Sequence, residues 1–245
     1  MNSRAGQEAA LHEIVTALRE SASAVSSFTG SVADGSAEQA GASALQCVLC
    51  RLAARSAERS LRTFFSEFVN DPRVRENFRG SRGFCREHTP MLAQCGEALG
   101  VAILYADLAD EIRRRWRSKC APQKRTLLSR WLPAAEAPIC PACSAEADAE
   151  ARFAAALAHG LHEDESLWEL LDGDGSLCAR HVEAVAATAS PGVAARLLAD
   201  ECLKMDRLCA ELEEFVRKND YRFRDEPWGS ERDSWRRALL RLCRR

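Results

Sequence analysis

One cysteine–histidine pattern occurs twice in this chain of 245 residues, with the same internal spacing each time. The first copy is Cys47-x-x-Cys50 followed by Cys85-x-x-His88, and the second is Cys140-x-x-Cys143 followed by Cys178-x-x-His181. Each position of the second copy lies 93 residues after its counterpart. Three thiols and one imidazole are a complete tetrahedral ligand set for a structural metal ion. These eight residues therefore predict two bound ions.

The similarity between the two copies extends beyond the cysteines and histidines. A shift of 93 residues places Phe64 on Leu157, Phe78 on Leu171 and Leu104 on Leu197, and it places Gly80 on Gly173. Apolar residues match apolar residues without a gap over about 60 positions. Such self-similarity at a fixed period is the signature of a duplicated structural unit.

The hydrophobic spacing predicts an all-α fold. Leu61, Phe64, Phe65 and Phe68 follow the i, i+3, i+4, i+7 pattern of a helix face, and no segment alternates as a strand does. Glycine-containing loops supply the positive φ needed to reverse the chain within each unit. We expect two helix–loop–helix units, each clamped by a Cys3His site, and a C-terminal helical cap. The expected segments are an N-terminal amphipathic helix with a flexible linker (1–44), the first repeat (45–112), a basic connector (113–137), the second repeat (138–216) and the cap (217–245).

The spacing leaves open which pairs share an ion. Cys47 and Cys50 could meet Cys85 and His88 within one copy, or they could meet Cys178 and His181 across a pseudo-two-fold axis. A short helical hairpin in each copy favours the local arrangement.

Zinc is the metal we expect, as two ions, because it accepts thiolate and imidazole ligands tetrahedrally. An iron–sulfur centre or another redox metal uses similar ligands and is the alternative, and metal-free thiols are a third possibility. Cys140-Pro141-Ala142-Cys143 resembles a redox dithiol, but such motifs work on a βαβ scaffold that this sequence does not predict.

Composition argues for a reducing compartment. The 11 cysteines are an odd number, so they cannot all pair as disulfides within one chain. No segment has the roughly 18 apolar residues of a membrane span, and the N-terminus lacks the features of a signal peptide. We expect a cytoplasmic protein that does not contact a membrane. The net charge of −2 does not by itself suggest a nucleic-acid partner.

One apolar stripe in the second copy has coiled-coil-like spacing. Its members are Leu198, Cys202, Met205, Cys209, Leu212 and Val216. We predict that this stripe faces the core, with Cys202 and Cys209 as buried small apolar residues. The alternative is an oligomer seam, so a homodimer through this stripe or through the N-terminal helix is possible.

Two segments lie outside the duplication and are candidate binding sites. Basic residues with interleaved tryptophans form an anion-binding candidate at Arg113, Arg114, Arg115, Arg117, Lys124 and Arg125. The tail is a candidate site for a partner or ligand through Asp220, Tyr221, Arg222, Arg224, Glu226 and Trp235. The structural alternatives are a solvated linker and a tail whose ion pairs pack against the repeats.

These elements resemble a group of uncharacterised bacterial proteins that share a domain of unknown function. The resemblance rests on the Cys-x-x-Cys pairs, on Gly83-Phe84-Cys85 leading to His88, and on the tail from Asn219 to Phe223 with Ser234-Trp235. The second copy departs from it with Ser176 in place of the glycine. The resemblance covers roughly residues 45–242 and implies that the tail belongs to the domain. It implies no activity.

The sequence favours a zinc-stabilised, non-catalytic scaffold or adaptor that binds a protein partner. No nucleophile constellation or phosphate loop is recognisable, and a four-ligand metal site leaves no position for a substrate. A redox sensor or redox-metal protein using the same thiols is the alternative, and nucleic-acid binding through the basic connector is the third.

Overall fold

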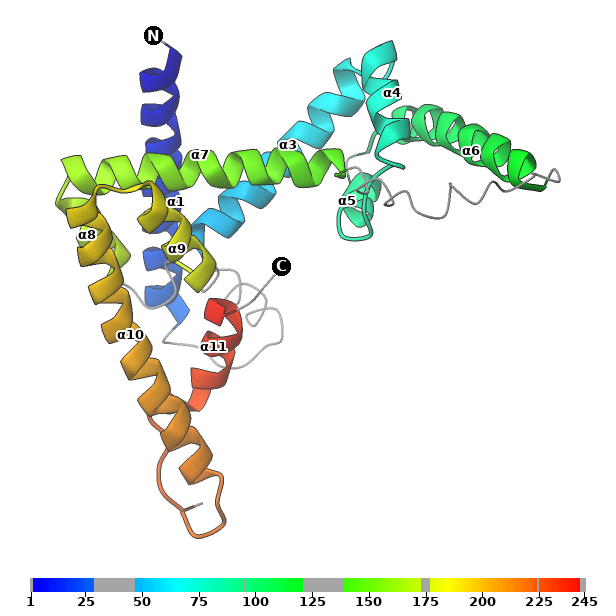
Figure 1. Ribbon diagram of the computed structural model, residues 1–245. Coiled ribbons are helices and arrows are strands. Elements are labelled where there is room, and N and C mark those ends of the chain that lie inside the picture. Colours follow the sequence, from blue (N-terminus) through cyan, green and yellow to red (C-terminus); the bar gives the residue numbers. More distant parts are fainter. Residues whose placement is uncertain are drawn as a thin grey trace, which may run out of the picture. The chain divides into compact units, whose positions relative to one another are not determined.

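The computed structural model describes residues 2–28, 47–94, 96–120, 139–172, 177–223 and 225–242. Over these residues the protein consists of helices joined by turns, without a strand (Figure 1), which confirms the all-α class. The helices are α1 (Asn2–Phe28), α3 (Val48–Glu67), α4 (Pro72–Gly80), α5 (Thr89–Gln94), α6 (Ala98–Cys120), α7 (Pro141–Glu163), α8 (Ser166–Leu171), α9 (Ala179–Thr188), α10 (Pro191–Lys218), the 3-10 turn η2 (Ser230–Asp233) and α11 (Ser234–Leu242).

The chain forms two compact units. Unit 1 comprises Met1–Ala53 and Glu150–Arg245, and unit 2 comprises Ala54–Ala149. The boundaries therefore fall inside α3 and inside α7. The helix order also follows the duplication: α3 and α7 begin 93 residues apart, as do α6 and α10.

The N-terminal helix is longer than the sequence pattern predicts. Its apolar residues Ile14 and Leu18 are buried as expected. The helix continues to Phe28, into the segment predicted to be a linker, and the remainder of that linker lies outside the described residues.

The core of unit 2 is an aromatic cluster. Leu61 and Phe65 of α3 are buried together with Phe78, Phe84 and Leu104. The rings of Phe78 and Phe84 lie 5.4 Å apart between centroids, and the other aromatic pairs of the cluster are at similar distances. This geometry adds favourable edge-to-face contacts to the burial of apolar area. Phe68, the last residue of the apolar helix face predicted from Leu61 onward, is exposed.

A left-handed turn connects this core to Cys85. Arg82 and Gly83 have φ values of 59° and 88°. The Gly83 N–H donates to the Phe78 carbonyl over 3.0 Å, which closes the end of α4. A Cβ on Gly83 would lie 2.9 Å from a methyl group of Leu108, so both backbone and packing require glycine there. Gly80, the other predicted loop glycine, is the last residue of α4 and has no positive φ.

The core of unit 1 is built on α7. Phe153, Leu157 and Leu161 are buried on one face of this helix, as the spacing predicts. α1 approaches α7 closely at Gly160, where a Cβ would lie 2.6 Å from Leu11. The helices α8, α9 and α10 complete the unit, and α10 contacts both α9 and α11 (Figure 1).

The buried face of α10 is not the predicted one. The stripe from Leu198 to Val216 faces outward: these two side chains are 43% and 71% exposed, and Cys202 and Cys209 are also exposed. The helix instead buries an adjacent face, which consists of Val193, Leu197, Glu201, Lys204 and Leu208.

The reason for this error is a buried charge network. Lys204 donates to Glu201 over 2.9 Å and to the Leu171 carbonyl over 2.5 Å, while Arg241 of α11 binds the other oxygen of Glu201. Because these charges are paired, the residues can occupy core positions that an apolar pattern does not reveal. The network joins the end of α8 to α10 and α11.

Candidate metal centres

The first centre comprises Cys47, Cys50, Cys178 and His181, which all belong to unit 1. Cys47 directly precedes α3, and Cys50 lies in its first turn. Cys178 is the N-cap of α9, and His181 lies in the first turn of that helix. The Cys-x-x-Cys and the Cys-x-x-His of this centre are thus both at helix N-termini, where the helix dipole favours thiolate.

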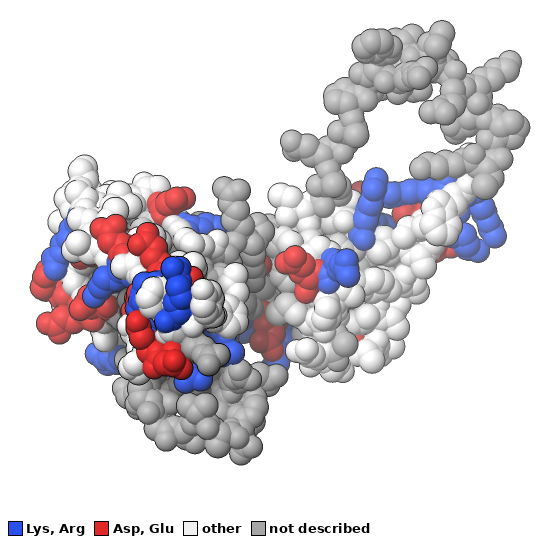
Figure 2. Space-filling model, turned by 90° about the horizontal axis from the view of Figure 1, so that it is seen from below, with Lys and Arg blue, Asp and Glu red and all other residues white. Residues whose placement is uncertain are grey.

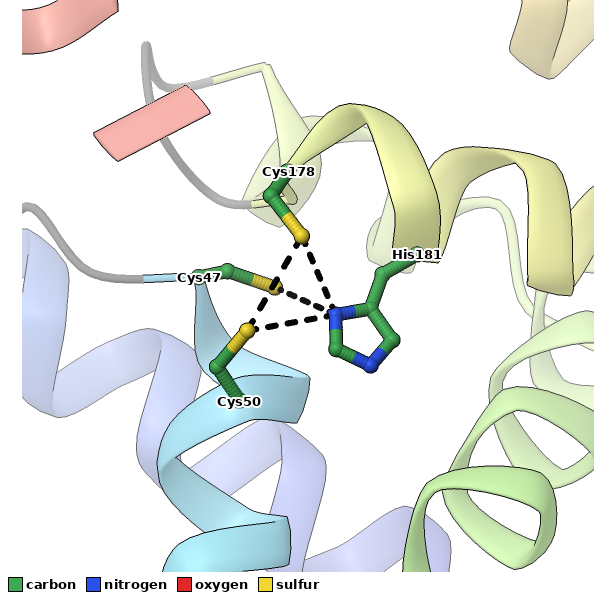
Figure 3. Close-up of side chains that lie close together, drawn as sticks. All are labelled: Cys47, Cys50, Cys178 and His181. Atoms are coloured by element: carbon green, nitrogen blue, oxygen red, sulfur yellow. Dashed lines mark hydrogen bonds between the residues drawn. The ribbon is translucent and has the colours of Figure 1, made fainter. Parts of the chain in front are cut away.

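The four ligand atoms of the first centre converge on one point (Figure 3). The sulfurs of Cys47, Cys50 and Cys178 lie 3.3, 3.3 and 3.1 Å from Nδ1 of His181. The sulfurs of Cys50 and Cys178 are 3.8 Å apart. Cys50 is half-buried, and the other three residues are buried.

The second centre comprises Cys85, His88, Cys140 and Cys143, all in unit 2. The sulfurs of Cys85, Cys143 and Cys140 lie 3.3, 3.4 and 3.9 Å from Nδ1 of His88. The sulfurs of Cys85 and Cys143 are 3.6 Å apart. Here Cys85 and Cys143 are the half-buried members.

Both sets fit a tetrahedral zinc ion. With a Zn–S bond of about 2.3 Å and a Zn–N bond of about 2.0 Å, tetrahedral geometry places two sulfurs about 3.8 Å apart and a sulfur and a nitrogen about 3.5 Å apart. The distances above lie around these values. The sulfurs are also well beyond the roughly 2.05 Å of a disulfide bond, and all six cysteines are free thiols. The donor atoms can therefore hold two metal ions.

Each centre combines the Cys-x-x-Cys of one copy with the Cys-x-x-His of the other. The local pairing favoured by the sequence is therefore wrong. The two elements of the first copy lie at different ends of a long helix: Cys47 directly precedes α3, whose 20 residues span about 30 Å. Cys85 packs in the core of unit 2 with the C-terminal half of α3, and Cys140 belongs to the same core.

Two glutamates complete the centres and were missed in the sequence. Nε2 of His88 lies 3.3 Å from Glu146, and Nε2 of His181 lies 3.7 Å from Glu150. A carboxylate is the usual outer partner of a metal-bound histidine. Glu146 lies within reach of Nε2 of His88, whereas Nε2 of His181 is buried without a hydrogen-bond partner in the described structure and Glu150 lies beyond hydrogen-bond distance. Both glutamates lie on α7, one turn apart. The first copy has alanine at the matching positions 53 and 57, so the duplication gave no signal for them.

An arginine lies beside the half-buried thiol of the first centre. Arg180 donates to both oxygens of Glu150, over 2.8 and 2.5 Å, and its guanidinium also interacts with Cys50. The matching position in the first copy is Glu87, which is exposed. The two centres therefore differ in the residue type at this position of the Cys-x-x-His element.

The pKa values within each set diverge. Contacts with Cys47 and Cys50 lower the pKa of Cys178 far below its usual range against the effect of burial, while burial above all, and then Cys178, raises the pKa of Cys47. In the second centre burial raises the pKa of Cys143 to about 12, with Cys85 adding to the effect. The pKa of Cys85 falls to about 7 because hydrogen bonds from His88 and other neighbours outweigh its own desolvation. Hydrogen bonds between neighbouring sulfurs stabilise one thiolate, whose negative charge then disfavours ionisation of the next thiol. A bound divalent cation would offset this repulsion.

The basic candidate residues of the described chain lie on α6, not in a connector loop. Arg113, Arg114 and Arg115 pair with Asp110 and Glu111 one turn earlier on the same helix. Arg117 is exposed, while Lys124 and Arg125 lie outside the described residues. On the face shown in Figure 2, basic and acidic side chains of the described residues are intermingled.

The described tail candidates form ion pairs with one another or with α10, or are exposed. Asp220 and Arg222 form an exposed ion pair at 2.7 Å, and Glu226 pairs with Arg217 of α10. Tyr221 is 82% exposed, Trp235 lies on α11, and Arg224 is outside the described residues. Lys218 ties the tail to α10 by donating to Glu231 over 2.6 Å. The tail belongs to unit 1, and the five candidate residues that the structure describes do not gather around one point.

The fold and the two centres define a helical protein with two Cys3His sets that could hold metal ions, and no described helix is long and apolar enough to cross a bilayer. The chain belongs to a family of unknown function, DUF6062, whose model matches residues 36–245. It is 28% identical over 178 residues to an uncharacterised 23.9 kDa protein from the xynA 3′ region of Caldicellulosiruptor sp. (strain Rt8B.4), covering 72% of this chain and 84% of that protein. No solved structure matches the chain.

Proposed function

We propose that this protein is a zinc-stabilised helical scaffold that binds a protein partner and has no catalytic role of its own. The observation that carries the proposal is the closed ligand set at the core of each unit. In the first centre the set joins segments 134 residues apart in sequence, Cys47 and His181. Four protein ligands fill the coordination shell of zinc, which is typical of structural sites and leaves no position for a substrate.

Zinc binding supplies the energy that such a scaffold needs. A structural zinc site contributes an apparent free energy of about 10–16 kcal/mol at neutral pH. A domain's net stability is about 5–15 kcal/mol, so each ion is comparable to the stability of the unit that it closes. Both units are small. The ions would fix the relative positions of segments that are distant in the chain.

The outward side chains of unit 1 support a protein partner. The helix α11 buries Ser234 and Arg241 and turns Trp235, Leu239 and Leu242 outward. Leu239 is 65% exposed. Exposed apolar and aromatic side chains with neighbouring arginines are the composition of protein interfaces, where tryptophan and arginine contribute most of the binding energy. We assign the outward stripe of α11 as the partner-binding surface.

Metal analysis tests the zinc part of this function. Protein purified anaerobically is expected to contain two equivalents of zinc and to lose helical circular dichroism when a strong chelator removes them. A protein that contains almost no metal and keeps its helical signal would contradict the proposal.

A substitution on α11 tests the partner part. Leu239→Asp should leave zinc content and helicity unchanged while abolishing the complex that the wild-type chain forms in quantitative cross-linking from its native cells. Leu99→Asp, at an exposed leucine of the other unit, is the matched control and should retain the complex. If Leu239→Asp retains it as well, the surface is wrongly assigned.

A further inference from the structure

The two metal centres differ in how far their sulfurs are shielded from solvent. In the first centre Cys47 and Cys178 are buried, at 3% and 2% exposure, and the half-buried Cys50 has Arg180 beside it. In the second centre only Cys140 among the thiols is buried. Cys85 and Cys143 are half-buried, and the position that corresponds to Arg180 carries the exposed carboxylate of Glu87.

The two accessible thiols of the second centre are also neighbours. Their sulfurs are 3.6 Å apart, so an approach of about 1.5 Å would bring them to the length of a disulfide bond. They come from different segments, since Cys85 follows the turn at Gly83 and Cys143 lies in the first turn of α7. In the first centre, by contrast, any disulfide would include either Cys47 or Cys178, both of which are buried.

We propose that the second centre is a peroxide-sensitive site, in which Cys85 and Cys143 form a disulfide and release the metal while the first centre keeps its own. The inference rests on the proposed zinc occupancy of both centres. It distinguishes a structural ion in unit 1 from a releasable ion in unit 2, and it assigns the oxidant to the class of small hydroperoxides.

The chemistry balances with hydrogen peroxide as the oxidant. The thiolate of one cysteine attacks a peroxide oxygen, an S–O bond forms as the O–O bond breaks, and hydroxide leaves. The second sulfur then attacks the sulfenic sulfur, forming the S–S bond and expelling the oxygen as hydroxide, which is protonated to water. Two electrons from the sulfur pair have reduced one peroxide to two waters. Cys140 and His88 remain as two ligands, too few to hold zinc in a structural site.

The test uses the full-length chain with serine at the five cysteines that belong to neither set, namely Cys95, Cys120, Cys202, Cys209 and Cys243. Its zinc content is measured first, because fewer than two equivalents at this stage would refute the proposed function and not the inference. Hydrogen peroxide is then added in the presence of a chromogenic zinc chelator, and disulfides are mapped by mass spectrometry.

We expect release of one equivalent, at least about 10-fold faster than the other, with a Cys85–Cys143 disulfide and rebinding of zinc after a dithiol reductant. Equal release from both centres, a disulfide that includes Cys47 or Cys178 at the fast step, or unreacted Cys85 and Cys143 would overturn the proposal.

Discussion

The two ring nitrogens of each histidine have different surroundings. Nδ1 faces three sulfurs in both centres, while Nε2 of His88 lies 3.3 Å from Glu146 and Nε2 of His181 lies 3.7 Å from Glu150, without a hydrogen bond. A carboxylate within hydrogen-bond distance fixes the tautomer and orientation of the ring and increases its basicity as a ligand. We therefore expect Glu146 to be a positioning residue for the second centre.

Glu146→Ala tests this role. Loss of the carboxylate should weaken zinc binding at the second centre by about 10–100-fold, because the imidazole is no longer oriented from its far side. Competition against a chelator of known affinity measures the change. Glu146→Gln, whose amide oxygen can still accept the Nε2 proton, should bind with intermediate affinity. The control is Asp148→Ala on the exposed side of α7, and an equal affinity in Glu146→Ala and Asp148→Ala would argue against the assignment.

Residue types predicted the ligands but not their supports. The eight candidate ligands could be singled out because cysteine and histidine at two-residue spacing are rare and occurred twice in register, and the structure brings them together in two sets of four. Glutamates spaced by four on a helix are common and usually solvated, so nothing marked Glu146 and Glu150. Arg180 could not be recognised either, because charged residues on a helix are common and usually solvated. Its counterpart in the first copy, Glu87, carries the opposite charge.

At the scale of elements, local geometry decides how each centre is presented. The turn at Arg82 and Gly83 reverses the chain after α4 and leads to Cys85. The buried network on α10 binds the end of α8 and the helix α11. The spacing of apolar residues predicted these helices well. It misplaced the buried face of α10 because the paired charges of Glu201 and Lys204 occupy core positions.

Gly83→Ala should destabilise unit 2. A side chain in the left-handed region costs about 1–2 kcal/mol, and the close approach to Leu108 adds to this cost. Denaturant unfolding at saturating zinc measures the free energy. Gly80→Ala is the matched control: its Cβ would meet no atom within 4 Å, and alanine favours the helix by up to about 1 kcal/mol. A change in the free energy of unfolding with the same sign for both substitutions would contradict the left-handed turn at Gly83.

Glu201→Ala should destabilise unit 1 by about 3–5 kcal/mol, because it leaves the cations of Lys204 and Arg241 buried without their shared carboxylate. Glu213→Ala, at an exposed position of the same helix, should change the free energy of unfolding by no more than about 0.5 kcal/mol. Thermal and denaturant unfolding of the two variants provide the comparison. A loss below about 1 kcal/mol in Glu201→Ala would show that the network is not buried as described.

At the scale of the whole molecule, the duplicated pattern is exchanged. Each compact unit takes its Cys-x-x-Cys from one copy and its Cys-x-x-His from the other. The constant offset of 93 residues could not distinguish this arrangement from local pairing, because the spacing between the two copies is the same whichever pairs share an ion. The lengths of α3 and α7 decide the outcome, and they place the ends of each helix in different units.

Zinc content of two double variants tests this exchanged pairing most directly. Cys47→Ser with Cys178→Ser removes two ligands of one centre, and the protein should retain one equivalent of zinc. Cys47→Ser with Cys85→Ser removes one ligand from each centre, and both ions should be weakened or lost. The opposite result, with one tightly held equivalent in the Cys47/Cys85 variant and none in the Cys47/Cys178 variant, would contradict the account.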